Sequence, residues 1–367
     1  MAEEGLTIAL PRDLHPAAWW VWALGLAAAA SRTTNPWLLS LVVLVATVTV
    51  LARRSDAPWA MSFRLYLYLG LLVVVLRMVF RVVFAGGFGT TVIVRLPEVP
   101  LPDWAAGITL LGPVTSEAVL SGLYDGMRLA AVIICVGAAN SLANPRRLLA
   151  SLPPALYEVG TAVVIALALF PQLAESVQRV RRARQLRGDP GKGIGALRRI
   201  VVPVLEDALE RSLSLAASMD SRGYGRAGTL TTRHRWTTGS LLVGGLLGLV
   251  VGISAVLDST TPRFLSWPML AAGLVLCAVG FTAAGRRVQR TRYRPDRWLA
   301  AEIVTAATGV CVATMMYVVA HARPDVVTPD PSLAPPLSAL ALVTVLLGLV
   351  PAFATPLPVM QDAAVPA

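Results

Sequence analysis

The stretch SLAASMDSRGYG, residues 214–225, ends an amphipathic helical pattern in the middle of a very apolar chain. Apolar residues recur there at three- and four-residue steps until Arg222 and Gly223 end the pattern. A second stretch, RRARQLRGDPG at residues 181–191, ends in the same way on Arg187 and Gly188. A left-handed glycine cap and a basic side chain that offsets the helix dipole explain either end alone. Two such ends, one helix length apart, indicate a paired device.

The composition around these two stretches is that of a membrane protein. Hydrophobic residues make up 56% of the 367 residues and charged residues only 14%, whereas soluble domains approach about a quarter charged. A helix needs roughly 20 apolar residues to cross a bilayer. Eight runs come near that length, the first of them short: 17–30, 37–52, 65–84, 119–142, 239–257, 265–284, 298–320 and 333–354. We therefore predict an all-α integral membrane protein with about eight transmembrane helices.

The net charge of +11 is distributed in a way that argues against a nucleic-acid partner. Lysine and arginine concentrate in short connections that fall on one side of the membrane, as the positive-inside rule requires. This side includes the central block and the loop at 286–297, whereas the connections at 85–116 and 321–332 fall on the other side. Both termini are therefore predicted to lie in the cytoplasm.

Four regions follow from this pattern. Residues 1–142 hold four spans, residues 143–236 a cytoplasmic block with a pair of long helices, and residues 237–257 a fifth span. Residues 258–367 hold the remaining spans. The long helices are expected at 156–187 and 197–222, with Pro203 in the first turn of the second. The apolar stretch 156–170 is short for a span, and whether it crosses the membrane stays open at this point.

The two helices ending in QLRG and SMDSRGYG resemble the coupling helices of the transmembrane T component of energy-coupling factor (ECF) transporters, the EcfT/CbiQ-like family. Four further stretches resemble the same family: LHPAAWW, NPWLLSLVVL, TSEAVLSGLYDGMRLAAV and ANPRRLLASLP. The resemblance runs over about residues 14–257 and has no counterpart beyond about residue 258. In that family, each coupling helix ends in a small residue, an arginine and a glycine, and docks into one of two cytoplasmic ATPases.

The resemblance therefore implies which residues contact the ATPases. The first motif is Leu186, Arg187 and Gly188, and the second is Ser221, Arg222 and Gly223. Leu186 and Ser221 each stand where the family usually has alanine. Arg184 competes with Arg187 as the first contact.

The same resemblance implies a function. The chain would be the coupling subunit of an ECF-type ABC importer in a bacterial cell membrane, linking two ABC-type ATPases to a substrate-binding S component. The cargo would be a vitamin, a metal ion or a similar micronutrient. ATP and magnesium would bind to the partner ATPases, so this chain would hold no cofactor and would not be an enzyme. The alternative is a self-contained secondary transporter, which would require paired halves with interrupted helices or intramembrane acids.

Charged residues within or near the apolar runs are candidates for intramembrane contacts, because charge is costly there. Arg77 and Arg81 lie one turn apart near the outer end of the third run, where they either line a pathway or a subunit contact, or extend to the outer headgroups. The helix expected around the fourth run carries Glu117, just before the run, and Asp125 and Arg128 within it. Asp125 and Arg128 are three residues apart, which is the spacing of an ion pair on a helix.

Overall fold

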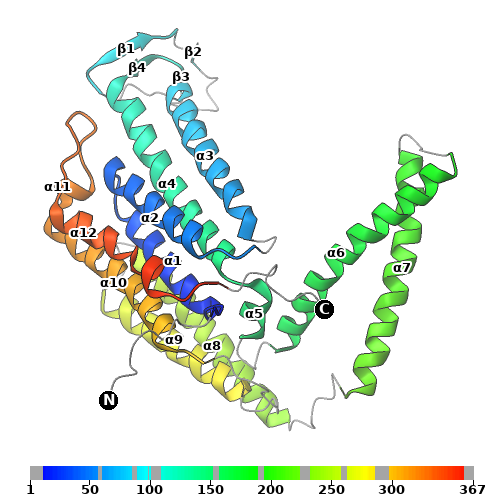
Figure 1. The fold of residues 1–367 in the computed structure, drawn as a ribbon. Coiled ribbons are helices and arrows are strands. Elements are labelled where there is room, and N and C mark those ends of the chain that lie inside the picture. The colour runs from blue at the N-terminus through cyan, green and yellow to red at the C-terminus, as the bar shows by residue number, and fades with distance from the viewer. Residues whose placement is uncertain are drawn as a thin grey trace, which may run out of the picture. The chain divides into compact units, whose positions relative to one another are not determined.

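The computed structural model describes residues 11–56, 60–84, 89–97, 99–100, 109–151, 157–188, 194–223, 232–257, 263–285 and 297–358. Its described part is mostly helical (Figure 1). Among the described residues, six helices are long and apolar enough to cross a membrane: Pro36–Arg53, Phe63–Val83, Ser116–Leu142, Trp236–Val256, Ser266–Gly285 and Ala300–Ala322. The chain divides into two compact units, one formed by Met1–Leu148 with Pro295–Ala367 and the other by Leu149–Arg294.

Polar side chains cap the N-termini of the first helices in the first unit. The His15 and Asn35 side chains accept hydrogen bonds from the first turns of α1 (Pro16–Ser31) and α2 (Pro36–Arg53), each of which has proline at its first position. Such prolines fit because the first helical N–H has no partner within the helix. A short 3-10 turn, η1 (Ala60–Ser62), leads into α3 (Phe63–Val83). Thr115 caps α4 (Ser116–Leu142), and α5 (Pro145–Ala150) follows it.

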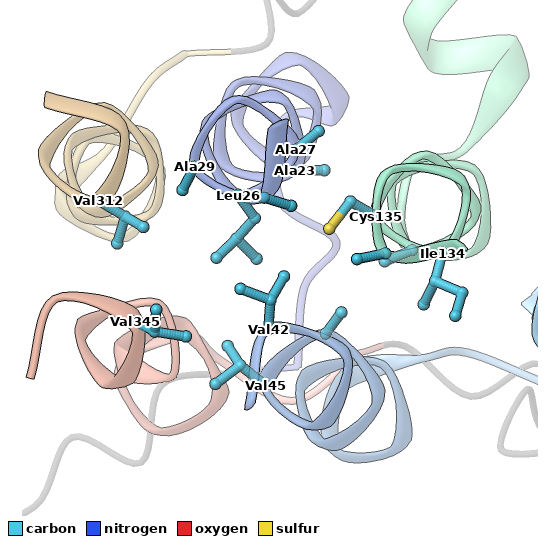
Figure 2. Close-up of a cluster of buried hydrophobic side chains, with 14 of the residues drawn as sticks. Ala23, Leu26, Ala27, Ala29, Val42, Val45, Ile134, Cys135, Val312 and Val345 are labelled. Carbon is cyan, nitrogen blue, oxygen red and sulfur yellow. The ribbon is translucent and has the colours of Figure 1, made fainter. Parts of the chain in front are cut away.

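The C-terminal part of this unit packs onto its first two helices. It comprises α10 (Ala300–Ala322), α11 (Pro324–Val327), α12 (Ala339–Leu347) and α13 (Val350–Ala354). α10 lies along α1, and α12 contacts both α10 and α2. Figure 2 shows side chains from these helices and α4 around a shared core: Leu26, Val42, Val45, Cys135, Val312 and Val345.

The last predicted span, 333–354, needs correction. The helix begins only at Ala339, after two prolines at positions 335 and 336, and it is interrupted at Gly348 and Leu349. Pro351 has no N–H to continue the ladder of hydrogen bonds. The interruption leaves the Gly348 carbonyl available, and the buried Trp22 indole N–H donates to it at 2.9 Å.

Glycines bring α1 and α10 into backbone contact. A Cβ atom at Gly25 would overlap the carbonyl group of Gly309, and a Cβ atom at Gly309 would overlap the backbone of Trp22. Small residues allow this close approach between membrane helices. The segment beyond the ECF-like region therefore packs directly on the first helix.

Two small strand pairs correct the prediction of an all-α chain. β1 (Val92–Arg95) pairs antiparallel with β4 (Pro113–Thr115), and β2 (Val99–Pro100) pairs with β3 (Thr109–Leu110). They belong to the connection between α3 and α4, where residues 90–94 read Thr-Thr-Val-Ile-Val. Such β-branched residues favour strands over helix.

The part of the second unit that the structure describes forms four helices: α6 (Tyr157–Leu186), α7 (Ile194–Ser221), α8 (Thr232–Leu257) and α9 (Arg263–Gly285). The two long helices of the central block are thus confirmed, but Pro203 lies inside α7 rather than in its first turn. α8 and α9 pack closely through small residues, because a Cβ atom at Gly273 would overlap the backbone at Gly248 and Leu249. The predicted accessory region 258–367 is divided, with α9 in this unit and α10 to α13 in the first.

Candidate coupling site at two helix tips

The first tip is the C-terminal end of α6. After Leu186, which is 89% exposed, the chain turns through Arg187 and reaches Gly188 with a φ of +76°. The Arg187 N–H donates to the Arg184 carbonyl at 3.0 Å, and the Gly188 N–H donates to the Gln185 carbonyl at 3.1 Å. A positive φ is unfavourable for residues with a Cβ atom, which explains glycine at this position.

The second tip, at the end of α7, has the same backbone conformation. Gly223 also has a φ of +76°. The Arg222 N–H donates to the Met219 carbonyl at 3.1 Å, and the Gly223 N–H donates to the Asp220 carbonyl at 2.9 Å. The predicted glycine caps are therefore confirmed at both tips. The two Arg-Gly sequences present their arginines from equivalent turns.

Exposure distinguishes the arginines near the first tip. Arg187 and Arg222 are exposed, as are Leu186 and Ser221 beside them. Arg184, the competing candidate, is only half-buried and lies within the last turn of α6. Arg187 is therefore the more exposed of the two arginines at the first tip.

The contacts between α6 and α7 show how the two helices, and therefore their tips, are oriented relative to each other. The Ser176 hydroxyl donates to Asp207, and Arg211, one turn further along α7, donates to Gln172, one turn earlier on α6. Contacts that move forward along α7 therefore move backward along α6, so the two helices are antiparallel. At 1.5 Å per residue, Arg187 lies about 16 Å beyond Ser176, and Arg222 lies about 22 Å beyond Asp207. The tips therefore point toward opposite ends of the pair.

Alanine at Gly188 or Gly223 is expected to loosen its tip by about 1 to 2 kcal/mol, because alanine in the left-handed conformation is strained. Nothing lies within 4 Å of a Cβ atom built at either glycine, so the effect comes from the backbone alone. Hydrogen exchange at the tip amides should be roughly tenfold faster in each alanine variant. Asparagine tolerates a positive φ, so Gly188→Asn and Gly223→Asn are the matched controls. Unchanged exchange in the alanine variants contradicts this explanation of the caps.

The predicted intramembrane arginines lie where α3 meets α4. Gly122 and Gly126 of α4 leave room for the stems of Arg81 and Arg77, since added Cβ atoms would come within 2.9 Å and 3.3 Å of their Cβ atoms. Arg81 donates to the Ser121 hydroxyl at 3.2 Å, whereas the Arg77 side chain is exposed. Arg81 is therefore a contact between the two helices.

Glu117 lies in the first turn of α4 and binds the segment that precedes the helix. Its carboxylate accepts hydrogen bonds from the Thr90 hydroxyl, the Thr91 N–H and the Ser116 hydroxyl at 3.1 to 3.3 Å. An acidic side chain in the first turn is also favoured by the helix dipole. Glu117 thus anchors the strand connection to α4.

The predicted pairing of Asp125 with Arg128 is not observed. Both residues are described and half-buried, and no ion pair within 4.0 Å joins them. Three-residue spacing brings two Cβ atoms near each other, but aspartate is short, and the rotamers decide whether its carboxylate reaches a guanidinium.

Sequence reasoning missed the polar contacts that join the N-terminal helices to the C-terminal ones. Arg12 donates to both carboxylate oxygens of Glu302, at 2.8 and 2.9 Å, and Glu302 is 1% exposed. Arg53 donates to the Ala352 carbonyl at 2.9 Å. Glu302 offered a signal, because an acid at the start of an apolar run requires a partner. Nothing near it in sequence indicated that the partner lies 290 residues away.

Comparison with known proteins identifies the family of the chain. The sequence profile of the family described as "CbiQ: Cobalt transport protein" matches residues 9–233, which is more than half of the chain. The chain belongs to the CbiQ family. The matched region of this CbiQ family member includes both tips and ends as α8 begins.

A curated relative points to the same class. The energy-coupling factor transporter transmembrane protein EcfT of Exiguobacterium sibiricum is 30% identical over 109 residues, which cover 28% of this chain and 40% of that protein. The aligned region thus covers less than half the length of this relative. It is a multi-pass membrane transport component of the CbiQ family, distantly related to EcfT.

Proposed function

We propose that this chain is the T component of an ECF-type ABC importer in a bacterial cell membrane. The observation that carries the proposal is the pair of identically capped arginine tips, held at opposite ends of one antiparallel helix pair. Two equivalent and separated contacts suit two ATPase subunits, whether identical or different. The ATPases bind ATP with magnesium and hydrolyse it, and this chain transmits the resulting movement.

The chemistry of each tip suits docking. The planar guanidinium of arginine donates several hydrogen bonds in a fixed geometry, so it binds a carboxylate or a group of carbonyls in a partner's groove. Arg187 and Arg222 extend from helix ends, where neighbouring side chains do not cover them. Closure of the ATPases on ATP would displace the tips, and a packed helix moves as a body.

An exposed apolar stripe on α7 offers a surface for the substrate-binding S component. Leu205, Leu209 and Leu213 are 60%, 63% and 63% exposed, and α7 meets α6 through its other face, at Asp207 and Arg211. Apolar residues at four-residue steps form one face of a helix. The movement of α7 would therefore reach a membrane partner whose cargo is a vitamin, a metal ion or a similar micronutrient.

Contacts at the two ends of the first unit support eight spans rather than six. Arg12, before α1, bonds to Glu302 at the start of α10, and Arg53, at the end of α2, bonds to Ala352 in α13. At the opposite end of these helices, the Asn35 amide donates to the carbonyls of Val326 and Pro336. The short α1 and the interrupted α12–α13 therefore run between the same two ends as α2 and α10.

The same end contacts bear on the apolar start of α6. Arg147, just after α4, donates to the Asp13 carbonyl at 3.1 Å, so α4 ends on the side where α10 begins. The intervening residues must cross the membrane an even number of times. Since α8 and α9 supply two crossings, a further crossing by α6 alone would break this parity. We therefore place residues 156–170 on the cytoplasmic side, together with both termini.

Cysteines introduced at Asp56 and Thr328 should label from opposite sides of the membrane. Both residues are exposed. Asp56 comes after the end of α2 and Thr328 after the end of α11, so they lie at opposite ends of the first unit. The background replaces Cys135, Cys277 and Cys311 with alanine. A membrane-impermeant maleimide applied to intact cells should modify only the cysteine at position 328. Labelling of both cysteines from outside overturns the eight-span topology.

Purification tests the proposed function itself. The chain should copurify from its native membrane with ABC-type ATPase subunits and with a small membrane protein. A self-contained secondary transporter would purify alone, and that result rejects the proposal.

A further inference from the structure

A polar cluster joins the two long helices at their contact. The Ser176 hydroxyl donates to Asp207 Oδ2 at 2.7 Å, and Arg211 donates to the two oxygens of the same carboxylate at 3.0 and 3.1 Å. Arg211 also reaches Gln172 at 3.5 Å, and Arg179 lies 3.9 Å from Asp207. We call these five residues, two on α7 and three on α6, the brace.

The brace borders the buried part of the contact: the side chains of Asp207 and Arg211 are 33% and 36% exposed, and that of Arg179 is 62% exposed. Ser176 is 3% exposed and Val204, one turn before Asp207, is 8% exposed. The Ser176 hydroxyl and the Arg211 guanidinium hold the pKa of Asp207 below its usual range, so the carboxylate is charged at neutral pH. A carboxylate with donors from two helices fixes both the distance and the register between them, because charge-assisted hydrogen bonds are short and directional.

The sequence places the brace on a face that would otherwise be solvated. Asp207 and Arg211 belong to the charged side of α7, whereas the apolar stripe of Leu205, Leu209 and Leu213 lies exposed on its opposite side. Apolar contacts allow helices to slide, since they have no preferred direction. A pair that relied on them alone would transmit movement poorly from one tip to the other.

We propose that the brace, centred on Asp207, makes α6 and α7 a single rigid lever, so that the Arg187 and Arg222 tips keep a fixed separation and the two ATPases move them together. The proposal rests on the proposed function for its consequence in transport. The rigidity itself is a property of this chain alone. Asp207, Ser176 and Arg211 are positioning residues, because they act on the ATPases only through the tips.

Distance measurement between the tips tests the brace without any partner. Spin labels are attached to cysteines at Ala183 and Ser218, both exposed and close to the tips, in the background that replaces the native cysteines with alanine. The purified full chain in nanodiscs should give one narrow distance distribution. Asp207→Ala should broaden it at least about twofold, because the carboxylate that joins the helices is gone. Glu210→Ala, which removes an exposed carboxylate from the same helix, should leave it unchanged.

Exchanging the two charges distinguishes a specific loss of the brace from a general loss of folding. Asp207→Arg combined with Arg211→Asp reverses the central pair, and this double variant should recover much of the narrow distribution that Asp207→Arg alone loses. In the complex with its ATPases, Asp207→Ala should retain the ATPases because both tips are intact. It should also weaken the stimulation of ATP hydrolysis by the T component severalfold, because the two tips would no longer move together.

The outcomes of this experiment are distinct. A narrow distribution in Asp207→Ala overturns the brace, whatever the ATPases do. A broad distribution with wild-type stimulation of hydrolysis also overturns it, because rigidity would then have no role in coupling. Failure of the wild-type chain to bind ATPases rejects the proposed function, and the distance distributions still decide whether the brace holds the helices.

Discussion

The double variant Arg187→Ala with Arg222→Ala is expected to purify without its ATPases, although the chain inserts in the membrane in wild-type amounts. Each arginine extends from an exposed tip, so removing it leaves the fold of the helix pair intact. At the interface, loss of a charged contact that is buried on docking costs about 2 to 5 kcal/mol. Each single variant should therefore weaken ATPase affinity by roughly two orders of magnitude, and the double variant should abolish recruitment. The ATPase retained on an affinity-tagged chain measures this.

Two kinds of control accompany the double variant. Arg181→Ala removes an exposed arginine from α6 six residues before the tip arginine and should retain both ATPases. Arg187→Lys and Arg222→Lys keep the charge but lose the planar donor geometry, so they should give intermediate affinity. Wild-type retention of both ATPases by the double alanine variant would reject the coupling role of the tips.

The glycine caps show what local sequence predicts well. Helix ends depend on interactions within a few residues, so the sequence alone is enough to predict left-handed caps at Gly188 and Gly223. The long apolar runs at 65–84 and 119–142 likewise became α3 and α4, because length and hydropathy are enough to identify such helices. The interruption of the last run at Gly348 was missed, although Pro351 is a local signal for it; its partner, the Trp22 indole N–H, lies more than 300 positions away and has no local signal.

Contacts between distant segments account for the rest of what the sequence did not predict. Asp207 and Arg211 could be placed on the charged face of α7, but their partner Ser176 has no feature that distinguishes it in the sequence. Glu302 stood out as an acid in an apolar run, yet nothing local connected it with Arg12. Asp125 and Arg128 show the opposite error, because favourable spacing predicted a pair that the structure does not form. Spacing fixes proximity, and rotamers and neighbouring helices decide the contact.

Among the helices beyond the CbiQ match, α10 to α13 belong to the first unit, and α10 and α12 contribute to its core. The family profile ends at residue 233, yet Val312 and Met316 of α10 are fully buried against the first helices. The backbone contact between Gly25 and Gly309 leaves no room for lipid between α1 and α10. These added helices therefore support the matched region.

Truncation after Asp258 is accordingly expected to remove most of the protein from the membrane. It takes away the partners of Arg12, Trp22, Asn35 and Arg53, leaving their donors unpaired at or within the bilayer. Interhelical hydrogen bonds in membranes contribute about 0.6 to 2 kcal/mol each, and several together approach the roughly 5 to 15 kcal/mol that stabilises a whole domain. Quantitative immunoblotting of membranes should show at least about a tenfold loss of chain. Complexes that do assemble should keep their rate of ATP hydrolysis.

The control for this truncation ends the chain after Pro358 and so keeps every one of those contacts. It should accumulate to the wild-type level, because Leu357, whose carbonyl accepts the Arg12 N–H at 3.1 Å, is still present. The longer truncation then differs from it only in α9 to α13 and their connections. If the chain truncated after Asp258 accumulates and binds its ATPases normally but no longer stimulates hydrolysis, α9 to α13 act in the coupling mechanism, and their role as structural support is rejected.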